Sequence, residues 1–89
     1  MRLSILMPVY NEAETVVEAL KRVLDVRFPC EVEVIVVDDG SVDATPQMLD
    51  AFDDHRVVVQ RHALNRGKGA AIRTASRFAT GDYMVIVDA

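Results

Sequence analysis

The sequence is poor in cysteine and has no long apolar run, and each absence excludes a class of protein. Its single cysteine, Cys30, cannot form a disulfide within the chain. A lone cysteine is typical of a reducing compartment, where we expect Cys30 to be a buried or half-buried structural thiol. No apolar run approaches the ~18 residues of a membrane-spanning helix. The N-terminal run stops early at Pro8, too short for a signal peptide and better suited to a strand. We therefore expect a cytoplasmic protein.

Clustered positive charge is also missing. The formal net charge is −4, and no run of Lys or Arg exceeds two residues. A nucleic-acid partner is therefore not expected. With 89 residues, of which 51% are hydrophobic and 27% charged, the chain reads as one small globular domain and not as a disordered segment. A domain of this size buries only about 60–65% of its unfolded surface, so it folds with little margin.

Strand and helix patterns alternate along the whole chain. Apolar runs predict strands at Leu3–Met7, Val34–Val37, Val57–Val59 and Tyr83–Val87. Helical periodicity predicts helices at Asn11–Leu24, from near Asp43 or Thr45 to about Phe52, and at Ala71–Ala79. Asn11 followed by Glu14 resembles a capping box. The βαβαβαβ order predicts an α/β fold with a parallel four-stranded sheet and helices on both faces.

Polar clusters follow three of the predicted strands. They are Tyr10-Asn11-Glu12, Asp38-Asp39-Gly40-Ser41 and Asp88. In open parallel sheets, ligands bind outside the carboxyl ends of the strands. The three clusters therefore converge on one rim, which is the main functional signal in the sequence.

The adjacent aspartates Asp38 and Asp39 should point to opposite faces of their strand. One of them could accept a hydrogen bond from a ring N–H such as uracil N3–H or guanine N1–H. Both could equally cap the following turn. Tyr10 could stack on a base and Glu12 could bind ribose hydroxyls, but packing and a first-turn helix charge explain them as well.

The glycines of Gly67-Lys68-Gly69 open a helix and allow close approach of a diphosphate to backbone N–H groups and to Lys68. A flexible loop with a solvated lysine is the alternative. Gly69 stands where a Walker A loop needs Ser or Thr, and Pro8 stands where a dinucleotide fingerprint needs a glycine turn.

Asp88 is suited to a hard divalent cation. We place His55 and His62 on the surface, far from the rim, and find no nucleophilic triad and no zinc spacing.

Four motifs together resemble the family-two glycosyltransferases, in the correct order and over essentially the whole chain. They are Pro8-Val9-Tyr10-Asn11-Glu12, the run from Val36 to Thr45, Asn65-Arg66-Gly67-Lys68-Gly69-Ala70-Ala71, and the run from Gly81 to Ala89. The glycine–lysine loop is most similar to the branch that includes dolichyl-phosphate mannose synthase and the polyprenyl-phosphate glucosyltransferases.

The resemblance implies the nucleotide-sugar-binding half of a GT-A fold, using a UDP- or GDP-sugar. It implies that Pro8, Tyr10 and Glu12 line the base and ribose pocket. Asp39 would read the base and Lys68 would lie near the diphosphate. Asp88 would be the first aspartate of the D-x-D motif that holds Mg²⁺ or Mn²⁺.

By the same resemblance, residues 1–89 are the N-terminal half of such a domain and end at the middle position of D-x-D. No catalytic residue is expected within them, so the 89-residue chain alone should be inactive. The full-length protein would be a metal-dependent hexosyltransferase that inverts the sugar. It would lie at the cytoplasmic face of a membrane and use an acceptor, a polyprenyl phosphate lipid or a saccharide, bound outside this segment.

Three other interpretations fit parts of the sequence. A nucleotidyltransferase would usually carry a glycine-rich loop after the first strand, and a receiver-type domain would carry its acidic pair there. A non-catalytic nucleotide-binding fragment remains an alternative. The family's strand order, three-two-one-four, also predicts an edge at Tyr83–Val87, which contains no charge and no proline. We therefore expect self-association through that strand.

Overall fold

A computed structural model describes all residues from 1 to 89 and contains four strands and three helices. In chain order they are β1 (Arg2–Val9), α1 (Val16–Asp25), β2 (Glu31–Asp39), α2 (Thr45–Ala51), β3 (Val57–His62), α3 (Lys68–Phe78) and β4 (Tyr83–Ile86). All pairings are parallel, in the order β3-β2-β1-β4. None of the helices combines the length and the hydropathy that crossing a membrane requires.

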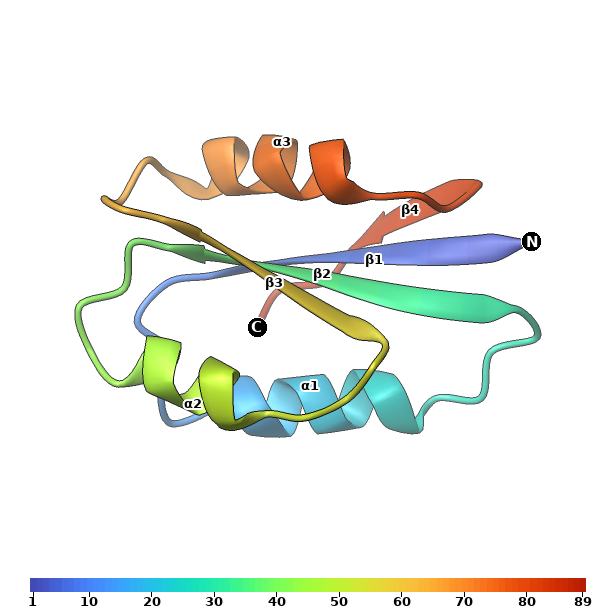
Figure 1. The fold of residues 1–89 in the computed structure, drawn as a ribbon, viewed down its shortest axis with the longest axis horizontal. Helices are drawn as coiled ribbons and strands as arrows, with labels where there is room; N and C mark the ends of the chain where they lie inside the picture. The colour runs from blue at the N-terminus through green and yellow to red at the C-terminus, as the bar shows by residue number, and fades with distance from the viewer.

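The sheet is buried on both faces at its centre, because β1 and β2 alternate their apolar side chains between two helical layers (Figure 1). One core joins β1 and β2 to α1 and α2 through Ile5, Met7, Val9, Val16, Leu20, Leu24, Val34, Val36 and Leu49. The other joins Leu6, Ile35 and Val37 to Ala71 and Ala75 of α3. The run Val34–Val37 is fully buried, as its continuous hydrophobicity predicts.

The predicted capping box at Asn11 and Glu14 is wrong. Helix α1 begins at Val16, and Asn11 lies in the preceding loop with a φ of 51°. The Asn11 side chain accepts a hydrogen bond from the backbone N–H of Val42 at 2.9 Å, so it is used for a tertiary contact. Asparagine tolerates this left-handed conformation better than most residues.

A polar network anchors the start of β4 on the neighbouring strands. The buried Ser4 hydroxyl donates to Glu33 at 2.6 Å and accepts from the N–H of Gly81. The N–H of Thr80 also donates to Glu33. Burial would raise the pKa of Glu33, but the hydrogen bonds from Ser4 and Thr80, with the charge of Arg2, hold the pKa below its usual value. This anchoring fixes the direction in which β4 carries Asp88 to the rim.

Strand β4 is an edge with little cover on either face. Its four side chains, from Tyr83 to Ile86, are 46–64% exposed. An uncharged apolar edge presents free backbone groups to any partner strand.

We predict that the 89-residue chain associates through β4 in solution. Val85→Lys should shift it toward monomer, because a lysine on an edge strand opposes strand pairing. Light scattering coupled to size exclusion measures the change. Val42→Lys adds the same charge on an exposed loop and is the matched control. A clean monomer for the unmodified chain would contradict the prediction.

Candidate functional site

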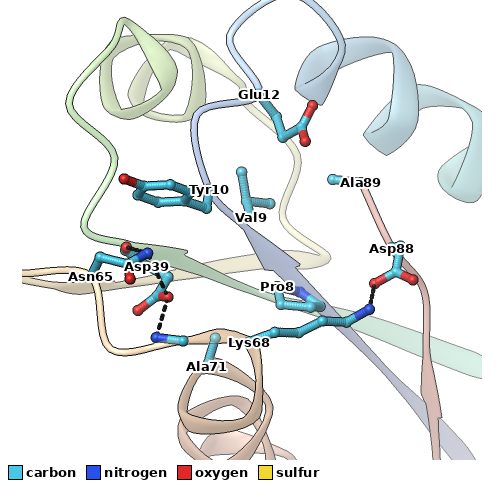
Figure 2. A pocket seen from close by; sticks show the side chains of 11 residues that line it. Pro8, Val9, Tyr10, Glu12, Asp39, Asn65, Lys68, Ala71, Asp88 and Ala89 are labelled. Atoms are coloured by element: carbon cyan, nitrogen blue, oxygen red, sulfur yellow. Dashed lines mark hydrogen bonds and ion pairs between the residues drawn. The ribbon is translucent and has the colours of Figure 1, made fainter.

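A cleft of about 340 Å³ opens at the carboxyl ends of the strands. Its walls include all six residues that the sequence assigns to a nucleotide-sugar site, namely Pro8, Tyr10, Glu12, Asp39, Lys68 and Asp88. Tyr10 and Glu12 reach in from the loop after β1, Asp39 from the end of β2, and Lys68 extends along the opposite wall toward Asp88 (Figure 2). The volume lies within the roughly 300–1,000 Å³ typical of small-molecule sites.

Hydrogen bonds hold the loops that follow β1 and β2 together. The N–H of Asn11 donates to the Ser41 hydroxyl at 2.8 Å, and the N–H of Glu12 donates to the buried Thr45 hydroxyl at 2.9 Å. The Glu12 carboxylate accepts from the Thr15 hydroxyl. Tyr10 and Glu12 therefore lie on a fixed stretch of backbone, with the Tyr10 side chain 44% exposed at the mouth of the cleft.

The two adjacent aspartates point to opposite faces of the sheet, as expected. Asp38 accepts from the N–H of Ser41 at 3.0 Å, and its other oxygen, Oδ2, has no hydrogen-bond partner. The Nε of Arg61 lies 3.7 Å from that oxygen. Asp38 does not line the cleft, whereas Asp39 does.

Asp39 is 3% exposed and accepts four hydrogen bonds at distances of 2.7 to 3.2 Å. Oδ1 accepts from His62 Nδ1 and from the N–H of Arg66. Oδ2 accepts from the N–H of Gly67 and from the side-chain amide of Asn65. A carboxylate has about four acceptor positions, so Asp39 is saturated in the free protein.

Asp39 also lies beside the start of helix α3. Gly67, the residue before the helix, has no capping side chain and a φ of 101°. Asp39 places a negative charge against the helix start, where the dipole favours it. Burial alone would raise the pKa of Asp39, but the hydrogen bonds from His62, Arg66 and Gly67 keep the pKa below its usual value.

The surface position assigned to His62 is wrong. His62 is 7% exposed at the end of β3, with Nδ1 2.7 Å from Asp39 Oδ1 and Nε2 2.8 Å from the Thr74 hydroxyl. The strand prediction ended at Val59, short of the three residues that complete β3. In register, His62 pairs with Asp39 across the parallel strands, which brings the two side chains to the same face. His55 is exposed, as expected.

Gly40 allows the loop after β3 to close over the end of β2. Its φ is 73°, and a Cβ at this position would lie 2.4 Å from the backbone nitrogen of Asn65. Any other residue would push this loop away. The glycine therefore brings Asn65 within reach of Asp39.

Lys68 and Asp88 form an ion pair across the cleft, with Nζ 2.6 Å from Oδ1 (Figure 2). Both side chains are more than half exposed, so the pair is worth at most about 1 kcal/mol. The N–H groups of Arg66 and Gly67 are used by Asp39. Those at the start of α3 have no partner within the helix and remain for an anion.

The chain holds no group of three or more His, Cys, Asp or Glu side chains placed to bind a metal ion. Asp88 supplies one hard oxygen ligand. Such a ligand fits Mg²⁺ bound mainly through substrate phosphates and water, and does not form a metal centre by itself.

Comparison with known proteins agrees with this geometry. The family model described as "Glycosyl transferase family 2" matches residues 4–89. The chain belongs to this family. It is 38% identical over 91 residues to the undecaprenyl-phosphate 4-deoxy-4-formamido-L-arabinose transferase of Pseudomonas fluorescens, covering 97% of this chain and 27% of the relative. The family membership leaves the nucleotidyltransferase and receiver readings without support.

Two solved structures resemble the fold closely. Mannosyltransferase PcManGT from Pyrobaculum calidifontis, in complex with GDP-Man and Mn²⁺, has a TM-score of 0.89 and 35% identity over 98% of this chain and 27% of its own. S. aureus TarS 1-349, in complex with UDP, has a TM-score of 0.88 and 32% identity over 99% of this chain and 27% of its own. These neighbours confirm the GT-A type of α/β fold. The chain spans less than a third of the length of the curated relatives it matches.

We predict that Asp39→Asn lowers the free energy of unfolding by about 1–3 kcal/mol at neutral pH. The asparagine NH₂ group would face N–H groups that now donate to a carboxylate oxygen, so at least one of these hydrogen bonds is lost. The depressed pKa of Asp39 means that its carboxylate stabilises the fold above its unfolded pKa, near 4, and that this stabilisation is lost as the pH falls through the lower folded value. The difference between wild type and variant should therefore shrink below about pH 4.

Urea unfolding at a series of pH values measures this difference. Asp50→Asn removes an exposed carboxylate from α2 and serves as the matched control. A difference that stays constant from neutral to acid pH would show that the Asp39 hydrogen bonds do not hold the loop.

Proposed function

We propose that this chain is the donor-binding part of a glycosyltransferase that uses a UDP- or GDP-sugar. The observation that carries the proposal is the convergence of Tyr10, Glu12, Asp39, Lys68 and Asp88 on one cleft at the carboxyl ends of the strands. Two solved structures that share this fold are complexes, one with UDP and one with GDP-Man. The convergence favours this function over a fragment that only binds a partner.

In the proposed complex, different residues of the cleft bind the base, the ribose and the diphosphate. Tyr10 stacks on the base beside Pro8, and Glu12 accepts hydrogen bonds from the ribose hydroxyls. Lys68 and the open N–H groups of α3 face the diphosphate. Because the Lys68–Asp88 pair is exposed and weak, Lys68 can exchange Asp88 for a phosphate oxygen at little cost.

Base recognition by Asp39 needs an acceptor position, and all four are filled in the free protein. The bond from the Asn65 amide is the longest, at 3.2 Å, and comes from an exposed side chain. Asn65 and Asp39 both line the cleft. We therefore infer that a ring N–H of the base replaces the Asn65 amide on Oδ2.

A divalent cation would bind Asp88 together with the diphosphate. When bound, Mg²⁺ or Mn²⁺ neutralises charge that develops on the departing nucleoside diphosphate. Release of Asp88 by Lys68 makes its carboxylate available and adds a cation near the phosphates. Metal and nucleotide should therefore bind together more tightly than either alone.

For the full-length protein we propose transfer of the sugar, with inversion, to a lipid phosphate. The similarity to an undecaprenyl-phosphate sugar transferase supports a lipid-phosphate acceptor. With such an acceptor, we propose that the full-length protein acts at the cytoplasmic face of a membrane. We propose that the general base for this transfer is supplied by residues beyond 1–89.

Calorimetric titration of UDP and GDP, with and without Mn²⁺, tests the proposal. We expect weak binding of one or both nucleotides, strengthened by Mn²⁺. Lys68→Met should weaken binding of the nucleoside diphosphate about tenfold, the effect of one lost charge contact, and leave binding of the nucleoside unchanged. Folded protein that binds neither nucleotide would refute the donor-site assignment.

Asn65→Ala tests the exchange on Asp39. Removing the amide frees Oδ2, so nucleotide affinity should stay equal or rise up to about tenfold, while thermal stability falls slightly. Isothermal calorimetry and thermal unfolding, run on the same samples, separate the two effects. A loss of affinity greater than about tenfold would mean that Asn65 itself binds the nucleotide.

A further inference from the structure

The parallel register gives each aspartate at the end of β2 a basic neighbour on β3. Asp38 is aligned with Arg61, and Asp39 is aligned with His62. The two pairs differ in kind. Arg61 is 56% exposed and its Nε stays 3.7 Å from Asp38, whereas His62 and Asp39 are both buried and 2.7 Å apart.

The two oxygens of Asp39 face different surroundings. Oδ1 is bound by His62 and Arg66, neither of which lines the cleft. Oδ2 is bound by Asn65 and Gly67, both of which do. The histidine therefore holds the oxygen that points away from the ligand space, and the other oxygen is left toward it.

The far side of the imidazole is held by α3. His62 Nε2 lies 2.8 Å from the hydroxyl of Thr74, which is half-buried in the middle of the helix. Because Nδ1 faces a carboxylate, Nδ1 carries a proton. In the neutral ring, Nε2 then accepts from the Thr74 hydroxyl. Strand β2, strand β3 and helix α3 are thus joined by one chain of hydrogen bonds through His62.

A carboxylate, an imidazole and a hydroxyl in this order also occur in nucleophilic triads. Here the cleft opens at the Asp39 end of the chain of hydrogen bonds, and Thr74 does not line it. No substrate atom could approach the Thr74 hydroxyl from the cleft. The arrangement therefore orients Asp39 and does not activate a nucleophile.

We propose that His62 is a positioning residue for base recognition. By donating Nδ1–H to Oδ1, it fixes the rotation of the Asp39 carboxylate so that Oδ2 faces the cleft, where the exchangeable Asn65 bond gives way to a ring N–H of the nucleobase. This inference rests on the proposed donor-binding function.

Two substitutions separate the contacts of the two imidazole nitrogens. The side-chain nitrogen of His62→Asn can take the place of Nδ1 and keep the donor to Asp39. The side-chain nitrogen of His62→Gln takes the place of Nε2, which keeps the Thr74 contact and loses the Asp39 donor. We expect His62→Asn to bind UDP or GDP within about threefold of wild type, and His62→Gln to bind about tenfold or more weakly.

The ranking separates positioning from packing. Glutamine is the larger replacement and fills more of the histidine's volume, so a merely structural role would favour His62→Gln. Thermal unfolding of both variants shows whether each is folded. Equal binding by the two variants, or tighter binding by His62→Gln, overturns the proposal.

Nitrogen-15 NMR of the wild-type imidazole tests the same bond without a variant. A proton on Nδ1 supports the proposal, and a neutral ring protonated on Nε2 overturns it. If wild-type protein binds neither UDP nor GDP, the donor-binding function fails and the positioning role fails with it. If wild type binds but the two variants do not separate as expected, only the role of His62 is lost.

Discussion

The carboxylate of Asp39 is the point on which the arrangement of the rim depends. A buried carboxylate is costly unless its acceptor positions are filled, and here four donors fill them. These donors come from the end of β3 and from the loop that leads into α3. One side chain therefore sets the position of the loop that leads to Lys68, the first residue of α3. The same group that would read a base also holds the wall against which the diphosphate would lie.

The loops after β1 and β2 are positioned by a second set of short-range constraints. Asn11 turns the chain out of β1 with a left-handed φ and bonds the next loop in both directions, through its own N–H and its side chain. Thr45 begins α2 and accepts from Glu12. The absence of a Cβ at Gly40 lets the loop after β3 approach the end of β2. Together these contacts make the rim a rigid frame even though each loop is exposed.

Periodicity and residue order were sufficient to predict the layers, the parallel sheet and the convergence of polar clusters, because these follow from hydrophobic patterning within each segment. Position at the rim was predictable for Asp39 and Asp88 because Asp39 ends a strand and Asp88 closely follows one. The role of His62 was not predictable, because it depends on the register between β2 and β3 and because His62 lies beyond the apolar part of its strand. Asn11 matches a helix-cap pattern in the sequence. Its side chain instead accepts a hydrogen bond from the loop after β2, a contact that the local sequence does not reveal.

Under the proposed function, the two ends of the cleft differ in stiffness. At the Asp39 end, buried hydrogen bonds hold the acceptor, and moving it would leave several donors unsatisfied. At the other end, Lys68 and Asp88 meet in an exposed ion pair that solvent screens. Affinity for the nucleoside would then come from a preformed surface, whereas the phosphate end can rearrange as charge arrives. This division suits a site that must hold one part of its ligand while a bond at the other part breaks, because charge on the diphosphate rises only during transfer.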